Sequence, residues 1–190
     1  MDIPRSVQTY ERVQHLLESG GYVEAFNLCQ EALKSGEYEP GVYFQMGVLL
    51  LKLGHYQDCL VAFQRAKEID SRDSNCHNNM GIALHRLGRL PEAANQMRQA
   101  ILMNPNHAGA RVSLAAVLID MRQFKHACEE CRIAINIAPD KFQAHSNLGD
   151  ALRALGDTAG ALAAYTKAQE LAPDNELVRA KLDNLKQATT

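Results

Sequence analysis

The sequence of 190 residues predicts an all-α protein in which antiparallel helix pairs stack in a row. Three observations support this prediction. Residues of the same type recur every 34 positions through five periods, apolar residues within a period fall at helical spacing, and in all but one period a glycine separates two helical stretches. Because neither helix of a pair can bury its apolar face alone, neighbouring pairs must pack together.

Several positions of the repeat keep the same kind of residue at all five steps. One position is always leucine, a second is always alanine, and a third is always alanine or cysteine. We interpret these positions as the packed interior of the protein. The residues concerned are Leu16, Leu50, Leu84, Leu118 and Leu152; Ala32, Ala66, Ala100, Ala134 and Ala168; and Ala25, Cys59, Ala93, Ala127 and Ala161.

Glycine marks two further positions. At the predicted end of the first helix, where a left-handed residue is favoured, the series is interrupted only by Arg122. The second position lies within the first helix, where a small residue lets the two helices approach closely. Three repeats have glycine there, and the other two have Val13 and Ala115. The glycines are Gly20, Gly54, Gly88 and Gly156 in the first series, and Gly47, Gly81 and Gly149 in the second.

The spacing of apolar residues predicts individual helices. In the second repeat a first helix is expected over Val42–Leu53 and a second helix over Gln57–Ile69. In the third repeat Pro91 fits the first turn of the second helix, where its missing N–H costs little. A last helix over Glu176–Gln187 has an apolar stripe of Val178, Leu182 and Leu185, and is expected to cap the open end of the array. Its charged residues, Lys181 among them, are expected to stay in solvent.

The period, the glycine between two helices, the small residues of the second helix and the closing prolines Pro105, Pro139 and Pro173 resemble the tetratricopeptide repeat (TPR). The resemblance covers residues 6–175 as five units, with a cap and tail at 176–190, and the first unit departs most from the pattern. It implies a right-handed superhelix in which the first helices line a concave groove. The units are 6–39, 40–73, 74–107, 108–141 and 142–175.

Composition argues against several classes of function. A formal net charge of −2 leaves no basic excess for a nucleic-acid backbone. Apolar runs such as Met46–Leu51 are far shorter than the roughly 20 residues of a membrane helix. Five cysteines, an odd number, and an N-terminus without a secretory signal favour a reducing compartment, so we expect the cytoplasm.

A second stripe on each first helix varies from repeat to repeat, so we interpret it as surface that is free to bind. The TPR resemblance places this stripe in the concave groove, and its apolar character in the second to fourth units predicts a site for a partner polypeptide. Burial by superhelical curvature or by the second helices is the alternative. The predicted groove residues are Phe44, Gln45, Val48, Leu51, Asn78, Asn79, Ile82, His85, Arg86, Val112, Ser113, Ala116, Ile119, Asn147, Asp150 and Arg153.

Polar residues beside this stripe suggest how a peptide would be held. Gln45, Asn79, Ser113 and Asn147 share one position of the repeat, and amides can pair with a peptide backbone. The set resembles part of the asparagine ladder of O-GlcNAc transferases, although simple solvation is the alternative. The carboxylate clamp of other TPR proteins uses Lys, Asn and Arg. The matching positions here are Phe44, Val48, Asn79, Gly109 and Ser113, and the cationic members are missing, so we expect no binding of acidic C-terminal tails.

Catalytic and metal sites have little support in the sequence. Cys128 and Cys131, with His126 nearby, supply one pair of thiols, whereas a structural zinc site usually needs two such pairs. Cys131 falls at a core position, which favours packing. His77 and His145 are expected to be packed or to cap helices. No catalytic motif is present, so we expect neither an enzyme nor a cofactor nor a metal site.

These patterns predict a non-catalytic interaction module or scaffold that binds a peptide segment of a partner protein in its groove. One alternative is self-assembly through the first repeat, with Val7, Tyr10 and Val13 near its edge. Another is an accessory TPR module of a larger enzyme such as a glycosyltransferase. TPR architecture specifies a mode of binding rather than a partner.

Overall fold

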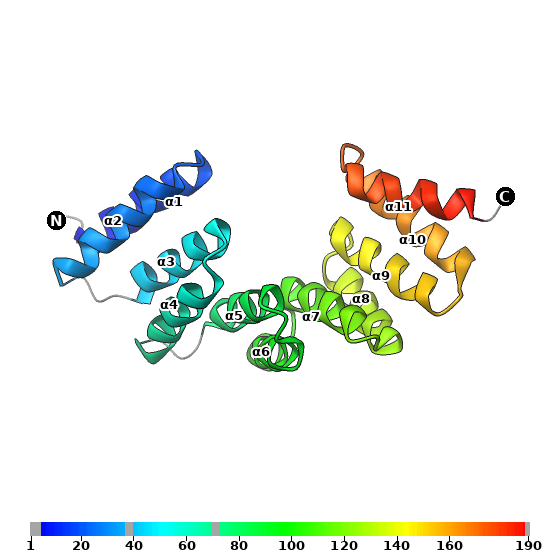
Figure 1. The fold of residues 1–190 in the computed structure, drawn as a ribbon, viewed down its shortest axis with the longest axis horizontal. Coiled ribbons are helices and arrows are strands. Elements are labelled where there is room, and N and C mark those ends of the chain that lie inside the picture. The colour runs from blue at the N-terminus through cyan, green and yellow to red at the C-terminus, as the bar shows by residue number, and fades with distance from the viewer. Residues whose placement is uncertain (1–4, 37–39, 70–72, 189–190) are drawn as a thin grey trace. The chain divides into compact units, whose positions relative to one another are not determined.

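The computed structural model describes residues 5–36, 40–69 and 73–188, with side chains for all of these except 5–8, 10 and 40. These residues form eleven α-helices and no β-strand (Figure 1). The helices are α1 (Arg5–Glu18), α2 (Tyr22–Lys34), α3 (Pro40–Leu53), α4 (Tyr56–Ile69), α5 (Ser74–Arg86), α6 (Leu90–Met103), α7 (Ala108–Asp120), α8 (Phe124–Ile137), α9 (Phe142–Ala154), α10 (Thr158–Leu171) and α11 (Glu176–Gln187).

The chain divides into two compact units, Met1–Met103 and Asn104–Thr190. In the first unit α1 packs on α2, α3 on α4 and α5 on α6, and these pairs stack through α2 on α3 and α4 on α5. In the second unit α7 packs on α8 and α9 on α10, the pairs stack through α8 on α9, and α11 packs on α10. The prediction of stacked helix pairs, about five repeats followed by a cap, is therefore confirmed.

Helix boundaries follow the sequence pattern closely. The last helix, α11, begins and ends at the predicted residues, and α3 and α4 begin one or two residues earlier than expected. Side chains just before several helices accept hydrogen bonds from first-turn N–H groups that have no partner within the helix. Asp73 accepts from Asn75 N at 2.8 Å, and Asp157 accepts from Gly160 N at 2.8 Å.

The turn between the two helices of a pair has the same backbone conformation in all five pairs. Gly20, Gly54, Gly88 and Gly156 have φ between +75° and +84°. Arg122, which interrupts the glycine series, also has a positive φ of 59°. The fourth pair therefore keeps the left-handed turn without glycine, at a cost of roughly 1–2 kcal/mol for the Cβ atom.

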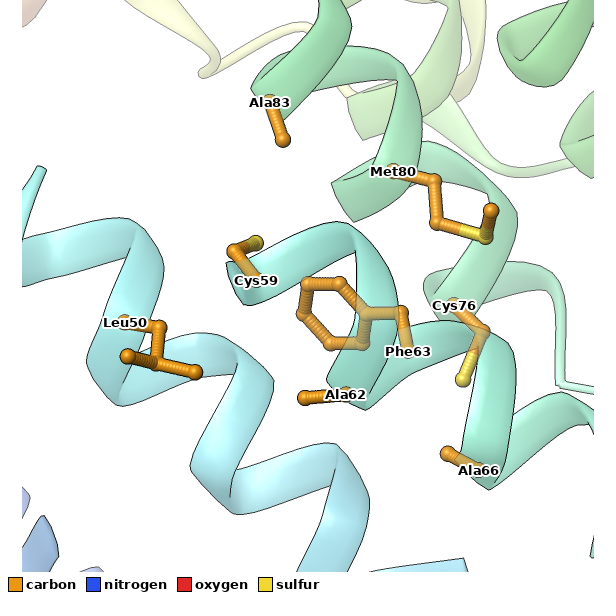
Figure 2. Close-up of a cluster of buried hydrophobic side chains, with 8 residues drawn as sticks. All are labelled: Leu50, Cys59, Ala62, Phe63, Ala66, Cys76, Met80 and Ala83. Atoms are coloured by element: carbon orange, nitrogen blue, oxygen red, sulfur yellow. The ribbon is translucent and has the colours of Figure 1, made fainter. Parts of the chain in front are cut away.

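The repeated positions form the interior, as the internal comparison of the repeats predicts. All five residues at the alanine-or-cysteine position are completely buried, and the five alanines of the second series are at most 5 % exposed. The leucine position is buried in four repeats, and Leu16 in the first repeat is half-buried. In the second repeat the ring of Phe63 lies among Leu50, Cys59 and Met80 (Figure 2).

Two facing positions inside each pair are matched in size. A Cβ atom on Gly47 would lie 2.7 Å from the Phe63 side chain. The same atom would lie 2.8 Å from Met97 if placed on Gly81, and 2.6 Å from Tyr165 if placed on Gly149. In the fourth repeat the equivalent residues are Ala115 and Cys131, both completely buried. A large side chain on the second helix thus requires glycine on the first, and a small cysteine accompanies alanine.

Candidate peptide-binding groove

The predicted groove stripe of the first unit lies on α3 and α5. Phe44, Val48 and Leu51 are spaced four and three residues apart, so they share one face of α3, and Ile82 continues the stripe on α5. All four are half-buried. These side chains are more accessible than the invariant leucines, although they are not fully exposed.

Contact with a second helix explains part of this burial. Phe44, Val48 and Leu51 pack against the core cluster around Phe63. The ring centroids of Phe44 and Phe63 lie 5.5 Å apart, with the ring planes inclined by 59°. Burial by the second helices, the alternative raised by the sequence, therefore applies in part to Phe44.

The polar groove residues of the first unit occupy different environments. Gln45 is only 2 % exposed, so its amide lies in the interior, whereas Asn79 and His85 are half-buried and Arg86 is exposed. Asn78 is 8 % exposed, and its Nδ2 contacts Asn79 Oδ1 at 3.5 Å. No described residue donates a hydrogen bond to Asn78 Oδ1, and such an unpaired buried acceptor destabilises a protein.

In the second unit the apolar part of the stripe lies on α7. Val112, Ala116 and Ile119 have the same four and three spacing as their counterparts on α3, and they are half-buried, as is Ser113. The first helix of the fourth repeat thus presents apolar surface with the same degree of access as α3.

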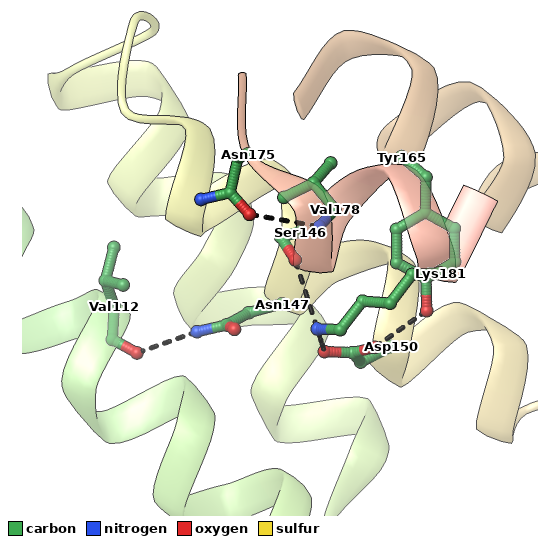
Figure 3. Close-up of polar contacts among 8 residues, drawn as sticks. All are labelled: Val112, Ser146, Asn147, Asp150, Tyr165, Asn175, Val178 and Lys181. Atoms are coloured by element: carbon green, nitrogen blue, oxygen red, sulfur yellow. Dashed lines mark hydrogen bonds and ion pairs between the residues drawn. The ribbon is translucent and has the colours of Figure 1, made fainter. Parts of the chain in front are cut away.

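On α9 the predicted amide contact is engaged within the protein. Asn147 Nδ2 donates to the backbone oxygen of Val112 at 3.1 Å, which links α9 to the preceding first helix α7 (Figure 3). Asn147 therefore contributes to the packing of α9 on α7.

The capping helix α11 covers the last part of the predicted stripe. Lys181 Nζ lies 2.6 Å from Asp150 Oδ2 and 3.2 Å from Ser146 Oγ (Figure 3). The Lys181 and Asp150 side chains are 26 % and 18 % exposed. The expectation that Lys181 stays in solvent is wrong, because its ammonium pairs with the carboxylate that α9 presents to α11. Arg153, by contrast, is exposed.

Tyr165 completes this polar network from α10. Its hydroxyl donates to Asp150 Oδ1 at 2.7 Å. Burial, together with this hydrogen bond to a carboxylate, raises the pKa of Tyr165 well above its ordinary value. Three helices, α9, α10 and α11, are thereby joined through one carboxylate. The repeat period could have indicated this contact. Lys181 stands 34 residues after Asn147, and both side chains bond to the preceding first helix.

Among the cysteines and histidines that drew attention in the sequence, Cys128, Cys131 and His77 are buried, whereas His145 is half-buried and His126 is exposed. Cys131 is completely buried, and burial raises the pKa of its thiol to about 12. Cys128 is also buried, and desolvation raises its pKa. His77 is buried and donates from Nδ1 to Gln96 Oε1 at 2.8 Å, and His145 donates from Nε2 to the Pro139 oxygen at 2.9 Å. The packing interpretation is confirmed for Cys128, Cys131 and His77.

The surface suggested for self-assembly is only partly described. Val13 is 1 % exposed and belongs to the core of the first two repeats, so it offers no docking surface. The side chains of Val7 and Tyr10 lie outside the described residues.

Among the described residues no three His, Cys, Asp or Glu side chains gather as metal ligands do. No helix of the described part of the chain is long and apolar enough to span a membrane.

Helix pairs with a left-handed turn residue, small residues where the helices cross and a polar-faced last helix define an α-solenoid of repeated units. Two family models of the tetratricopeptide repeat match the chain, one at residues 74–107 and 142–175 and the other at residues 40–73, and together these residues make up more than half of the chain. The chain belongs to the tetratricopeptide-repeat family.

Solved structures share this fold at low sequence identity. TTC0263, a thermophilic TPR protein of Thermus thermophilus, is 21 % identical with a TM-score of 0.79, covering 96 % of this chain and 99 % of that chain. YrrB, described as a TPR protein with an unusual peptide-binding site, is 18 % identical with a TM-score of 0.69. The match covers 92 % of this chain and 90 % of that chain.

A shorter likeness is to the first TPR of Spaghetti (RPAP3) bound to the HSP90 peptide SRMEEVD. It is 22 % identical with a TM-score of 0.60, covering 63 % of this chain and 95 % of that chain. At these identities the likeness concerns the fold. No curated protein sequence matches the chain significantly.

Proposed function

We propose that this protein is a non-catalytic interaction module that binds a segment of a partner polypeptide along the stripes of its first helices. One observation carries the proposal: the first helices α3 and α7 each have two apolar stripes with different access, and Ile82 continues the more accessible stripe on α5. Leu50 and Leu84 are 6 % and 4 % exposed, whereas Leu51 and Ile82, one or two residues away, are half-buried. Covering such accessible apolar surface is favourable.

The comparisons support a peptide as the ligand. YrrB and the first TPR of RPAP3 are peptide-binding proteins of the same fold. Micromolar affinity, about −8 kcal/mol, is a reasonable expectation for a segment held by preorganised helices. The RPAP3 ligand is an acidic peptide, but Phe44 and Val48 stand where a carboxylate clamp would need polar and cationic groups. We therefore favour an apolar partner segment.

The test is a quantitative pull-down with the intact protein and two variants. Ile82→Asp places a charge in the stripe, whereas Leu102→Asp makes the same kind of change on α6, at a side chain that is 75 % exposed. Phe44 is avoided because its ring packs on Phe63. We expect Ile82→Asp to lower recovery of the main partner at least about tenfold, since a buried unpaired charge is costly.

Leu102→Asp should leave recovery unchanged, and both variants should keep the helical circular dichroism of the original protein. The groove assignment is contradicted if Ile82→Asp recovers the same partner in the same amount. It is also contradicted if the two variants lose it equally.

A further inference from the structure

A second apolar hollow lies on a different side of the first unit. It is a cleft of about 490 Å³ between α2 and α4, with α3 as its floor. Phe26 and Leu33 form one wall, Val61 forms the other, and Met46 and Leu50 lie at the base. Its volume is typical of sites that bind ligands, which run from roughly 300 to 1,000 Å³.

This cleft is separate from the proposed peptide groove. Tyr43, Met46 and Leu50 face the cleft, whereas the groove stripe of α3 consists of Phe44, Val48 and Leu51. Each residue turns a helix by about 100°, so these two sets lie on different sides of α3. A ligand in the cleft would leave the groove stripe uncovered.

The walls of the cleft have the shape that accommodates another helix. Phe26, Gln30 and Leu33 are spaced four and three apart on α2, and Asp58, Val61 and Arg65 are spaced three and four apart on α4. Such ridges fit between the ridges of a helix that packs against them. Each wall spans about 10 Å, or two helical turns. Val61 is 58 % exposed, so its apolar surface is available to an occupant.

Charge at the two ends of the cleft indicates the direction of that occupant. Asp58 lies in the first turn of α4 and has no ion-pair or hydrogen-bond partner among the described residues. Arg65, at the other end, is already paired with Glu68 at 2.9 Å. The unbalanced charge of the cleft is therefore negative and lies at the N-terminal end of α4.

The dipoles of the walls add to this preference. Helices α2 and α4 run parallel, because each is antiparallel to α3 between them. A third helix that runs antiparallel to both walls brings its C-terminal end, where Lys and Arg are favoured, next to Asp58. The opposite direction would set the dipole of the bound helix parallel to those of both walls, which is the less favourable arrangement.

We infer that this cleft is a second docking site, for an amphipathic helix of a partner protein. The bound helix lies antiparallel to α2 and α4, its apolar residues at i, i+4 and i+7 contact Phe26 and Val61, and a Lys or Arg near its C-terminus pairs with Asp58. The site therefore recognises a short apolar helix with a basic C-terminal end, independently of the proposed groove ligand.

The probe is a pair of stapled helical peptides with leucines at i, i+4 and i+7. One peptide ends in lysine, and the other ends in glutamate. Fluorescence anisotropy with the intact protein should show that the lysine peptide binds about two- to fivefold more tightly, as expected for an exposed ion pair. Asp58→Lys should reverse this preference. Glu24→Lys, the same charge change at an exposed position of α2 outside the cleft, should keep it.

Two further variants locate the bound peptide. Val61→Asp should lower the affinity at least about tenfold, and it should not disturb the fold because Val61 is largely exposed. Ile82→Asp should leave peptide binding unchanged, so failure of the groove proposal and failure of this one are distinguishable. The inference is overturned if the two peptides bind equally, if Glu24→Lys acts like Asp58→Lys, or if Ile82→Asp alone abolishes binding.

Discussion

The residue at the turn between two paired helices has a left-handed backbone conformation, whatever its side chain. Four of the five turns between paired helices use glycine at a left-handed position, and the fifth uses Arg122 in the same conformation. A long, flexible arginine side chain gives no reason for a positive φ. The conformation is imposed by α7 and α8, whose packing requires the same turn as the other pairs.

Replacing Arg122 by glycine should stabilise the protein. The change removes the strain of the Cβ atom, which stabilises the folded state by roughly 1–2 kcal/mol. It also increases the entropy of the unfolded chain, which offsets about 0.5–1 kcal/mol of that gain. We expect the free energy of unfolding in urea to rise by about 0.5–1 kcal/mol. Arg122→Ala keeps the Cβ atom and should bring no such gain. Equal stabilisation by both changes would show that the arginine side chain, and not the backbone, is responsible.

At the scale of the helix, a pair is held together by matched side-chain sizes. Gly47 gives room to Phe63, and Gly149 gives room to Tyr165, whereas Ala115 is accompanied by the small Cys131. The two positions are therefore coupled, and a change at one alters what is tolerated at the other.

A double-mutant cycle on Gly47 and Phe63 tests this coupling. Gly47→Ala should lower the free energy of unfolding by about 1–3 kcal/mol, because its Cβ would overlap the Phe63 ring. In a Phe63→Leu background, where the ring atoms are absent, the same change should cost less, with a coupling of about 0.5–3 kcal/mol. Additive costs in urea denaturation would contradict the size matching.

The last helix depends on one ion pair for part of its docking. Lys181→Met keeps the aliphatic stem but removes the ammonium, leaving a half-buried Asp150 carboxylate with only the Tyr165 hydroxyl. We expect a loss of about 1–3 kcal/mol and faster amide hydrogen exchange throughout α11. Arg179→Met, at an exposed side chain of the same helix, should cost less than about 0.5 kcal/mol. Equal exchange rates of α11 in the two variants would show that Lys181 does not stabilise the docking of this helix.

The helices and the interior are predictable because helical spacing and the repeat period are local properties of the sequence. The environment of polar residues is less predictable. Gln45 and Asn79 share one position of the repeat, yet the first is 2 % exposed and the second is half-buried. Their burial depends on side chains of neighbouring repeats. The cleft beside Val61 likewise requires the placement of three helices, which no spacing within one of them reveals.

At the scale of the whole molecule, the chain combines an interior that repeats with a surface that does not. The invariant positions build similar helix pairs, and the variable stripes of α3 and α7 are half-buried in both units. In the first unit these stripes bear half-buried apolar residues, Val48, Leu51 and Ile82 among them. A fold of this kind lets the ligand preference change without altering the core.

The most direct test of this account is amide hydrogen exchange of the intact protein with and without its recovered partner. The proposal that first helices bind the partner predicts slower exchange upon binding in Pro40–Leu53 and Ser74–Arg86, with little change in Leu90–Met103. Protection confined to second helices, with the two first helices unaffected, would contradict it.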